Sequence, residues 1–353
     1  MSWLPCLTRT FEDSQLSTIT IGHPLVDDYL VFVGARLRVN SWIAIGYDLK
    51  VFFSIVDKDP AAVTTADVFG FIKAQRAPRR GLKVVRLEDG EAGLSARTIK
   101  RRLASVSGLY AYLVARGDAG VKANPVPRGA ATRRPGRPGR WGPPLIRTPR
   151  TLPRVLSPAE ATAFMAALRT HRDRAMVEAM LLGGLRRCEV LGLRMADVSA
   201  GEHRLFIAEG KGGHQRRVPV SGRFFATLAA YLSQERPVTD SDRVFVVLKQ
   251  PRRGRPLSAY GLDQIVEDAR GRAGIGRLTC HQLRHTCFTR LREEGMALEA
   301  IQAQAGHRSI DSTRIYVQLA NSWLAEEYHR AVDAIEADLA AGAPTGTQST
   351  GPR

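Results

Sequence analysis

Apolar side chains recur at helical spacing in three early segments of the chain, without the strict alternation that half-buried strands require. These segments are residues 24–37, 42–56 and 65–76. A fourth helix is expected to begin at the cap Ser95 and to stop near Gly117, and its apolar positions are Leu103, Val106, Leu109, Tyr110 and Leu113. We therefore predict a small helical bundle over residues 22–118, preceded by an N-terminal extension of residues 1–21.

The second part of the chain also follows a helical pattern, and it adds two short strands. The sequence SPAE at residues 157–160 is a capping-box pattern with proline at the first helical position, so a new domain is expected to begin here. Strands at 203–208 and 216–220 flank the Gly-containing turn EGKGGHQ. The predicted fold is mainly α with a small antiparallel β-sheet in this second domain (α+β), which spans residues 157–340 before a flexible tail, 341–353. Its further helices are expected at residues 173–182, 187–194, 222–234, 260–273, 281–294, 297–304 and 321–338.

Composition changes the picture between the two domains. The 41 residues from 119 to 159 hold nine prolines and nine Lys or Arg residues but no Asp or Glu. Because prolines remove backbone donors and break helices, residues 119–156 are expected to form an extended basic linker. A flexible, solvated tether would also join two domains, but a single sign of charge favours a linker that follows DNA phosphates. The candidate contacts in it are Arg133, Arg134, Arg137 and Arg140.

The whole chain is basic, which points to a polyanionic partner. Its 353 residues include 52 Lys or Arg against 34 Asp or Glu, giving a net charge of +18 and a pI near 10.5. Nucleic acid is the leading candidate for that partner. A second basic group occupies the first turns of the helix after Ser95, where phosphate contact competes with simple solvation as the explanation. Its members are Arg97, Lys100, Arg101 and Arg102.

Several other functions find no support in the sequence. No uncharged apolar run approaches the roughly 18 residues of a membrane span, and the first residues lack a signal-peptide pattern, so we expect a cytoplasmic protein. Cys280, His281, His285 and Cys287 lie close together, but zinc sites normally take ligands from two separated pairs, so no metal is predicted. The turn around Lys211 lacks the Walker A pattern, and no ATP or other cofactor is expected.

The residues with useful chemistry gather in the second domain. Arg186 follows two glycines directly before a predicted helix, where its guanidinium and free backbone N–H groups can bind phosphate. Lys211 is expected at the hairpin tip, and His281 and Arg284 share one helix face. Taken singly, each is more often a structural or solvated side chain. Two further candidates, nine residues apart, are His307 and Tyr316.

Taken in order, these segments resemble the tyrosine recombinase and phage integrase family of site-specific DNA recombinases. GGLRRCEVLGLRMADV is similar to the family's first-arginine box, EGKGGHQRRVPV to its lysine hairpin, CHQLRHT to its HxxR box, and AGHRSIDSTRIYVQL to its GH box and tyrosine. Glu189 and Asn124-Pro125 match as well, and the first domain more weakly resembles the family's helical, SAM-like core-binding domain. By this resemblance the catalytic residues are Arg186, Lys211, His281, Arg284, His307 and Tyr316.

The resemblance implies DNA strand transfer without metal or ATP. Tyr316 would attack a phosphodiester to form a covalent 3′-phosphotyrosine, and the two arginines of the set would stabilise the negative transition state. Lys211 would protonate the leaving 5′-oxygen, His281 would assist proton transfer, and His307 would bind the scissile phosphate. The implied partner is double-stranded DNA with specific recombination sites, gripped by a clamp of two domains. Four protomers would act together as a homotetramer on DNA, and the free protein would be a monomer or weak oligomer.

The sequence leaves the biological outcome open among integration, excision or transposition of a mobile element and resolution of DNA. It equally leaves open whether an accessory directionality factor takes part, and whether the helix over 321–338 packs in its own chain or on a neighbouring protomer. On DNA, the protein would associate with the nucleoid. Two alternatives remain. One is a catalytically silent DNA-binding protein of the same fold, against which the complete catalytic set argues. The other is a type IB topoisomerase-like enzyme, against which the GH box and the two-domain layout argue.

Overall fold

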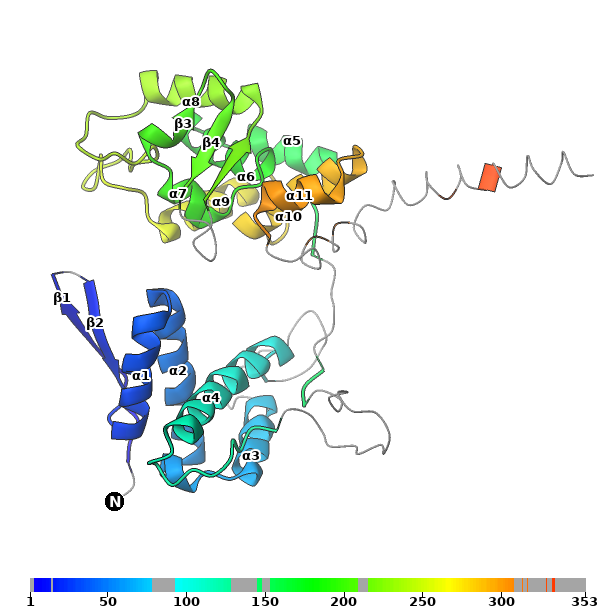
Figure 1. The fold of residues 1–353 in the computed structure, drawn as a ribbon. Coiled ribbons are helices and arrows are strands. Elements are labelled where there is room, and N and C mark those ends of the chain that lie inside the picture. The colour runs from blue at the N-terminus through cyan, green and yellow to red at the C-terminus, as the bar shows by residue number, and fades with distance from the viewer. Residues whose placement is uncertain are drawn as a thin grey trace, which may run out of the picture. The chain divides into compact units, whose positions relative to one another are not determined.

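The computed structural model describes residues 3–13, 15–77, 93–127, 145–147, 153–208 and 215–307, together with residues 313, 316, 328, 332 and 333. The chain divides into two compact units, Met1–Arg150 and Thr151–Arg353, each with its own core (Figure 1).

Four helices make up most of the described part of the first unit, drawn in blue and cyan in Figure 1. The ends of the last helix follow from local chemistry, because the Ser95 hydroxyl accepts the N–H of Thr98 and Gly117 adopts a left-handed φ of 79°. Leu30, Phe52 and Leu109 are buried where the helices meet. The predicted helices are confirmed as α1 (Pro24–Arg36), α2 (Val39–Val56), α3 (Thr65–Arg76) and α4 (Ala96–Arg116), with a 3-10 turn η1 at Pro60–Ala62.

A β-hairpin that the sequence analysis did not predict precedes these helices. Strand β1 (Thr8–Glu12) pairs antiparallel with β2 (Gln15–Thr20). All of β1 is exposed, whereas Ile19 of β2 is fully buried in the helical core. Because the hairpin buries so little of its own surface, it leaves only a weak alternation in the sequence.

Helix α2 is an unusually apolar helix of 18 residues. By length and composition alone it is long and apolar enough to cross a membrane, the single such helix in the described part of the chain. Its Asp48 is buried, however, and accepts hydrogen bonds from Arg101 Nη1 at 2.6 Å and Ser105 Oγ at 2.9 Å on α4. Leu49 and Phe52 lie in the same core, and α2 packs against α1, α3 and α4. Helix α2 is therefore the central helix of this unit.

The described ends of the predicted linker pack against the units. Asn124 Nδ2 donates to the Ser107 carbonyl at 2.9 Å, and Val126 and Ile146 are buried in the core of the first unit. At the other end, the N–H of Leu156 donates to Thr286 Oγ1 at 3.0 Å in the second unit. The prediction of an extended, DNA-following segment thus concerns mainly residues 128–144, which lie outside the described residues.

The second unit surrounds α6, whose residues from Ala175 to Leu181 are all buried. Helices α8 and α10 pack against α6, and its Leu181 precedes the loop that carries Arg186. The predicted mainly α fold with a small antiparallel sheet is confirmed here. The helices are α5 (Pro158–Ala166), α6 (His171–Leu181), α7 (Arg187–Gly192), α8 (Gly222–Gln234), α9 (Ala259–Arg272), α10 (Cys280–Glu293) and α11 (Leu298–Ala305), with a 3-10 turn η2 at Met195–Asp197.

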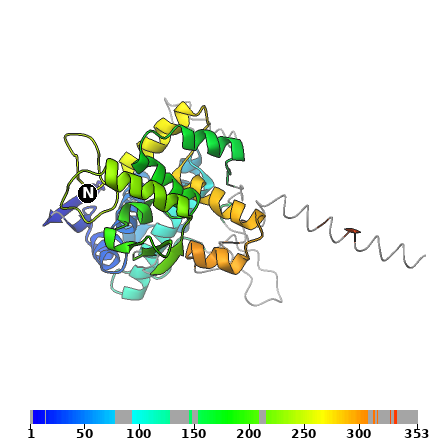
Figure 2. The ribbon, with the colours of Figure 1, turned by 90° about the horizontal axis from the view of Figure 1, so that it is seen from above.

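The sheet of the second unit has the order β3-β4-β5, with all pairs antiparallel. Its strands are β3 (Val198–Ser199), β4 (Arg204–Ile207) and β5 (Arg216–Pro219). Leu205 opposite Val218 faces the core, which fixes the register because a one-residue slip would expose both. Figures 1 and 2 both place α10 and α11, in orange, together at one side of this unit, where α11 meets β5 through Arg216.

Candidate active site

Arg186 stands at the junction that the two glycines create. Gly184 has a left-handed φ of 67°, and a Cβ there would collide with the Phe288 ring, so the chain turns sharply before α7. Arg186 is the N-cap residue of α7, and its backbone N–H donates to Glu189 Oε2 at 2.9 Å. Its Nη1 donates to Glu189 Oε1 at 2.7 Å. The predicted position of Arg186 before a helix is therefore confirmed, and its side chain is oriented by a buried carboxylate.

Glu189 connects several arginines of the site. Its side chain is fully buried, and Arg216 grips both of its oxygens, with Nη1 at 3.0 Å and Nη2 at 2.9 Å. Arg284 Nη1 lies 4.0 Å from Oε2. Burial by itself would raise the pKa of Glu189, but the hydrogen bonds and charge of Arg216, followed by those of Arg186, outweigh burial and lower it. Glu189 is thus held as a fixed negative charge.

Arg284 on α10 is held almost entirely inside the protein, 1% exposed. It donates from Nη1 to the Gly184 carbonyl and from Nη2 to the Ala305 carbonyl at 2.7 Å. Its guanidinium carbon lies 4.7 Å from the centre of the Phe288 ring, a cation–π contact. Burial and, next, the charge of Arg186 lower its pKa to about 10, so it remains a cation at neutral pH.

Two histidines one helical turn apart form a pair on α10. His281 is exposed, His285 is partly buried, and their Nε2 atoms lie 3.0 Å apart. Burial and the nearby charge of His281 lower the pKa of His285 to about 4, so His285 is neutral at physiological pH. The His285 ring centre lies 5.7 Å from that of Tyr316. The pair therefore extends from solvent to the buried tyrosine.

His307 and Tyr316 complete the cluster. His307 follows α11, and its Nε2 lies 3.4 Å from Arg284 Nη2 while its Nδ1 lies 3.0 Å from Thr313 Oγ1. Its ring is stacked on that of Tyr316, with centres 6.3 Å apart. Tyr316 is 1% exposed, and burial raises its pKa to about 12 despite the opposing charge of Arg284.

A hollow of about 580 Å³ opens beside this cluster, between α7, α9 and α10. Arg186, His281 and Arg284 line it, together with exposed groups such as Arg187 and Arg277. Asp263, which pairs with Arg187, and Glu267 also line the hollow, so the side with Arg186, Arg284 and the N-terminus of α10 at Thr279 is the one that suits a phosphate group.

The predicted site residues fall into three groups: a cluster in the second unit, residues outside the described part of the chain, and the basic group on α4. Arg186, His281, Arg284, His307 and Tyr316 are brought together in the second unit, as the preceding distances show. Lys211 and the linker set Arg133, Arg134, Arg137 and Arg140 lie outside the described residues.

On α4 the basic group is not uniform. Arg97, Lys100 and Arg101 are exposed. The side chain of Arg102 is only 13% exposed, its Nη1 donates to Gln75 Oε1, and its Nε lies 3.8 Å from Asp48 Oδ1. Contact of this group with DNA remains a prediction, and the geometry favours Arg102 least.

Sequence reasoning missed Arg216 and Gln304. Gln304 on α11 is buried, and its Nε2 donates to the carbonyls of Gly183 and Pro219, each at 3.0 Å. These contacts join segments far apart in sequence. The sequence held a clue to Arg216 alone, because this residue begins the predicted strand after the lysine turn and lies within the segment that resembles the lysine hairpin.

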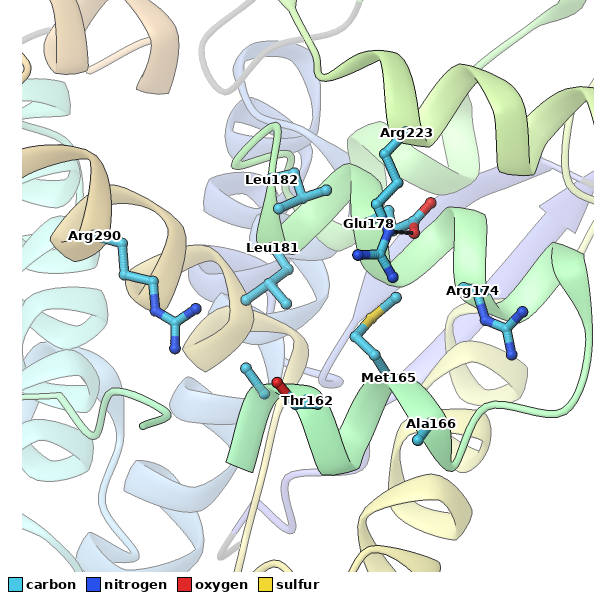
Figure 3. Close-up of a pocket in the computed structure, with 10 residues that line it drawn as sticks. Thr162, Met165, Ala166, Arg174, Glu178, Leu181, Leu182, Arg223 and Arg290 are labelled. Carbon is cyan, nitrogen blue, oxygen red and sulfur yellow. Dashed lines mark hydrogen bonds and ion pairs between the residues drawn. The ribbon is translucent and has the colours of Figure 1, made fainter. Parts of the chain in front are cut away.

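A second hollow, of about 440 Å³, lies between α5, α6, α8 and α10 (Figure 3). Leu181 and Met165 give it an apolar wall, and Arg223 Nε donates to buried Glu178 Oε1 at 2.9 Å. The other oxygen of Glu178 has no hydrogen-bond partner among the described residues. None of the predicted catalytic side chains lines this hollow, so it is not assigned to the reaction.

Comparisons with known proteins agree with this picture. Residues 154–322 match the model of the phage integrase family. Tyrosine recombinase XerC of Xylella fastidiosa (strain 9a5c) is 32% identical over 319 residues, covering 87% of this chain and 96% of the relative. The solved Tn1549 transposon integrase in complex with transposon right end DNA is 17% identical, with a TM-score of 0.64 over 87% of this chain and 98% of that one. A lambda integrase tetramer bound to a Holliday junction is 18% identical, with a TM-score of 0.60 over 82% and 76%. These likenesses confirm the fold.

Proposed function

Because the chain belongs to the tyrosine recombinase family, also called the phage integrase family, we propose that it cleaves and rejoins DNA at specific sites through a covalent 3′-phosphotyrosine on Tyr316. The observation that carries the proposal is the cluster of Arg284, His307 and Tyr316, next to a hollow lined by Arg186 and His281. This cluster supplies a nucleophile and the positive charge that phosphoryl transfer without metal uses, whereas Lys211, the proposed general acid, lies outside the described residues.

In the proposed reaction the scissile phosphate enters the hollow between α7 and α10. Its pentavalent transition state carries more negative charge than the ground state, and Arg186 and Arg284 face that charge. Arg284 is preorganised, because two backbone carbonyls and the Phe288 ring already fix its guanidinium. Little reorganisation is then needed when the charge develops.

Tyr316 must lose its proton during the attack. With its pKa raised to about 12, it is protonated throughout the neutral range, so a base must accept the proton as the phosphorus–oxygen bond forms. The neutral His285 lies beside Tyr316 and contacts His281, which is exposed to solvent, so the pair is suited to carry that proton away. By resemblance, Lys211 protonates the leaving 5′-oxygen.

The proposed partner is double-stranded DNA. Two of the solved relatives are described as bound to DNA, one as a tetramer on a Holliday junction, and we propose the same arrangement for this chain. The first unit would act as the core-binding domain, with exposed residues of α4 such as Arg97 and Lys100 on the phosphates. The basic segment around Arg133 would follow the DNA between the units.

A nicked suicide substrate tests the proposal. Wild-type protein and Tyr316→Phe are incubated with duplexes carrying candidate recombination sites, and protein–DNA adducts that resist SDS are measured. The proposal predicts an adduct with wild type and none with Tyr316→Phe, whose DNA affinity stays within about threefold because only a hydroxyl is removed. Binding without any adduct would favour a silent DNA-binding protein. Relaxation of supercoils without site preference would favour a topoisomerase.

A further inference from the structure

Arg216 is the first residue of β5, 30 residues after Arg186 and 88 residues before Gln304. Its guanidinium nevertheless binds both Glu189, which orients Arg186, and the Gln304 carbonyl. We propose that Arg216 is a positioning residue of the recombination reaction, which ties Glu189 to the end of α11 and so aligns Arg186 and His307 on one phosphate. This inference rests on the proposed function.

Arg216 holds Glu189 by both of its carboxylate oxygens. Two N–H groups of Arg216 meet the two carboxylate oxygens at 3.0 and 2.9 Å, and the Arg216 side chain is 11% exposed. The same carboxylate orients Arg186 through its backbone N–H and its Nη1. Because a bidentate pair fixes the plane of both groups, Arg216 determines where Glu189 can hold Arg186.

Arg216 also contacts the turn before His307. Its third nitrogen, Nε, donates to the Gln304 carbonyl at 3.2 Å in the last turn of α11, where a positive charge also suits the helix dipole. Gly306 follows with a left-handed φ of 61°, and a Cβ there would lie 3.1 Å from Arg216 Nε. The glycine therefore supplies both the turn and the space in which the guanidinium lies.

Gln304 strengthens the same connection from the other side. Its side-chain amide donates to the carbonyl of Pro219, at the end of β5, and to that of Gly183, beside the loop that Arg284 contacts. Two side chains thus join β5 to α11. A shift of either element would move Arg186 relative to His307, and misplacement by about 1 Å can cost about 100-fold in rate.

Arg216→Met is the main test, with Arg217→Met as the matched control. Arg217 is the next residue on the strand and is exposed, so its substitution removes the same charge without touching Glu189. We expect Arg216→Met to slow adduct formation on the suicide substrate about 100-fold at saturating DNA, with affinity for the duplex changed less than about threefold. Arg217→Met should keep the wild-type rate at saturation.

The pH profile separates positioning from a general loss of structure. Without Arg216, the main group that lowers the pKa of Glu189 is gone while its burial remains, so the pKa rises and the carboxylate loses its charge at a higher pH than in wild type. The adduct rate of Arg216→Met should therefore increase with pH more steeply than that of wild type. Combining Arg216→Met with Glu189→Gln should abolish this extra pH dependence, because no carboxylate remains to titrate.

Arg216→Lys guards against a variant that fails to fold. A lysine keeps the charge but cannot hold both carboxylate oxygens and the Gln304 carbonyl, so an intermediate loss of about tenfold is expected without the added pH dependence. Equal losses for Arg216→Met and Arg217→Met, or a loss confined to DNA affinity, would overturn the inference. If wild type forms no adduct, the proposed function itself fails, and the role of Arg216 falls with it.

Discussion

Each unit of the protein buries one carboxylate among arginines, yet the two carboxylates respond in opposite ways. Asp48 in the first unit is 1% exposed and Glu189 in the second is 4% exposed. Burial raises the pKa of Asp48 and prevails there over its partners, whereas at Glu189 the partners prevail and lower the pKa. Similar burial therefore does not imply a similar electrostatic role.

The difference lies in the geometry of the partners. Asp48 receives a hydrogen bond from the Ser105 hydroxyl and one from Arg101, whose side chain is 51% exposed, while Arg102 Nε stands 3.8 Å away. Glu189 receives both arms of Arg216, whose side chain is 11% exposed, and a backbone N–H as well. A partner that is fixed and dry compensates a buried charge better than one that remains in water. Asp48 thus joins α2 to α4 in the core of the first unit, while Glu189 positions arginines of the candidate site.

Neutralising each carboxylate in turn should give the largest contrast. Glu189→Gln leaves Arg186 and Arg216 inside the protein without a negative charge, so we expect a loss of about 3 to 5 kcal/mol in the free energy of unfolding of the second unit. Asp48→Asn keeps a hydrogen-bond acceptor and releases Arg101 to solvent, so about 1 kcal/mol is expected for the first unit. Scanning calorimetry measures both. Equal losses would remove the distinction drawn between the two sites.

Acid titration sharpens the same contrast, because the signs are opposite. The stabilisation from Glu189, whose pKa is lowered, is present at neutral pH and is lost as pH falls through its folded-state pKa. The stabilisation from Asp48, whose pKa is raised, is present in acid and is lost as pH rises through its folded-state pKa.

The effect of Glu189→Gln on stability should therefore shrink as pH falls below the ordinary pKa of a glutamate, and that of Asp48→Asn should shrink as pH rises above the ordinary pKa of an aspartate. Urea unfolding at several pH values, with wild type measured at each, provides the comparison. A change of the same sign in both variants would contradict the pKa directions on which it rests.

The local parts of this contrast could be predicted from the sequence, and the long-range parts could not. Ser95 and Gly117 mark the ends of α4 because capping and left-handed turns depend on neighbouring residues alone. The pairing of Glu189 with Arg216, or of Asp48 with Arg101, joins residues 27 and 53 positions apart, which no periodicity reveals.

The candidate site shows the same division. The ordered motifs placed Arg284, His307 and Tyr316 in one set, and the structure brings these three together. The burial of Arg284 and the contacts of Arg216 depend on how α10, α11 and β5 pack, so they emerge only from the fold. Hairpin β1–β2 was not predicted from the sequence, because its exposed strand β1 has almost no apolar pattern.

The smallest expected effect concerns the two arginines beside Asp48. The Arg101 side chain is 51% exposed, so Arg101 can leave Asp48 and bind a DNA phosphate instead. The Arg102 side chain is only 13% exposed and donates to Gln75, so Arg102 is expected to remain bound within the first unit. Arg101→Met should lower the slope of log affinity against log salt by about 1, the loss of one phosphate contact. Arg102→Met should leave that slope unchanged and lower the unfolding temperature of the first unit instead.

Fluorescence anisotropy of a labelled duplex across a salt series measures the slopes, and Lys100→Met is the control for an exposed charge on the same helix. If Arg102→Met alters the slope and Arg101→Met does not, the buried arginine is the one that meets DNA, and exposure fails as a guide to function on α4. If both leave it unchanged while Lys100→Met lowers it, Asp48 retains both arginines. The first unit would then hold its arginines as firmly as the second, and the contrast between the two carboxylates would be one of proton affinity alone.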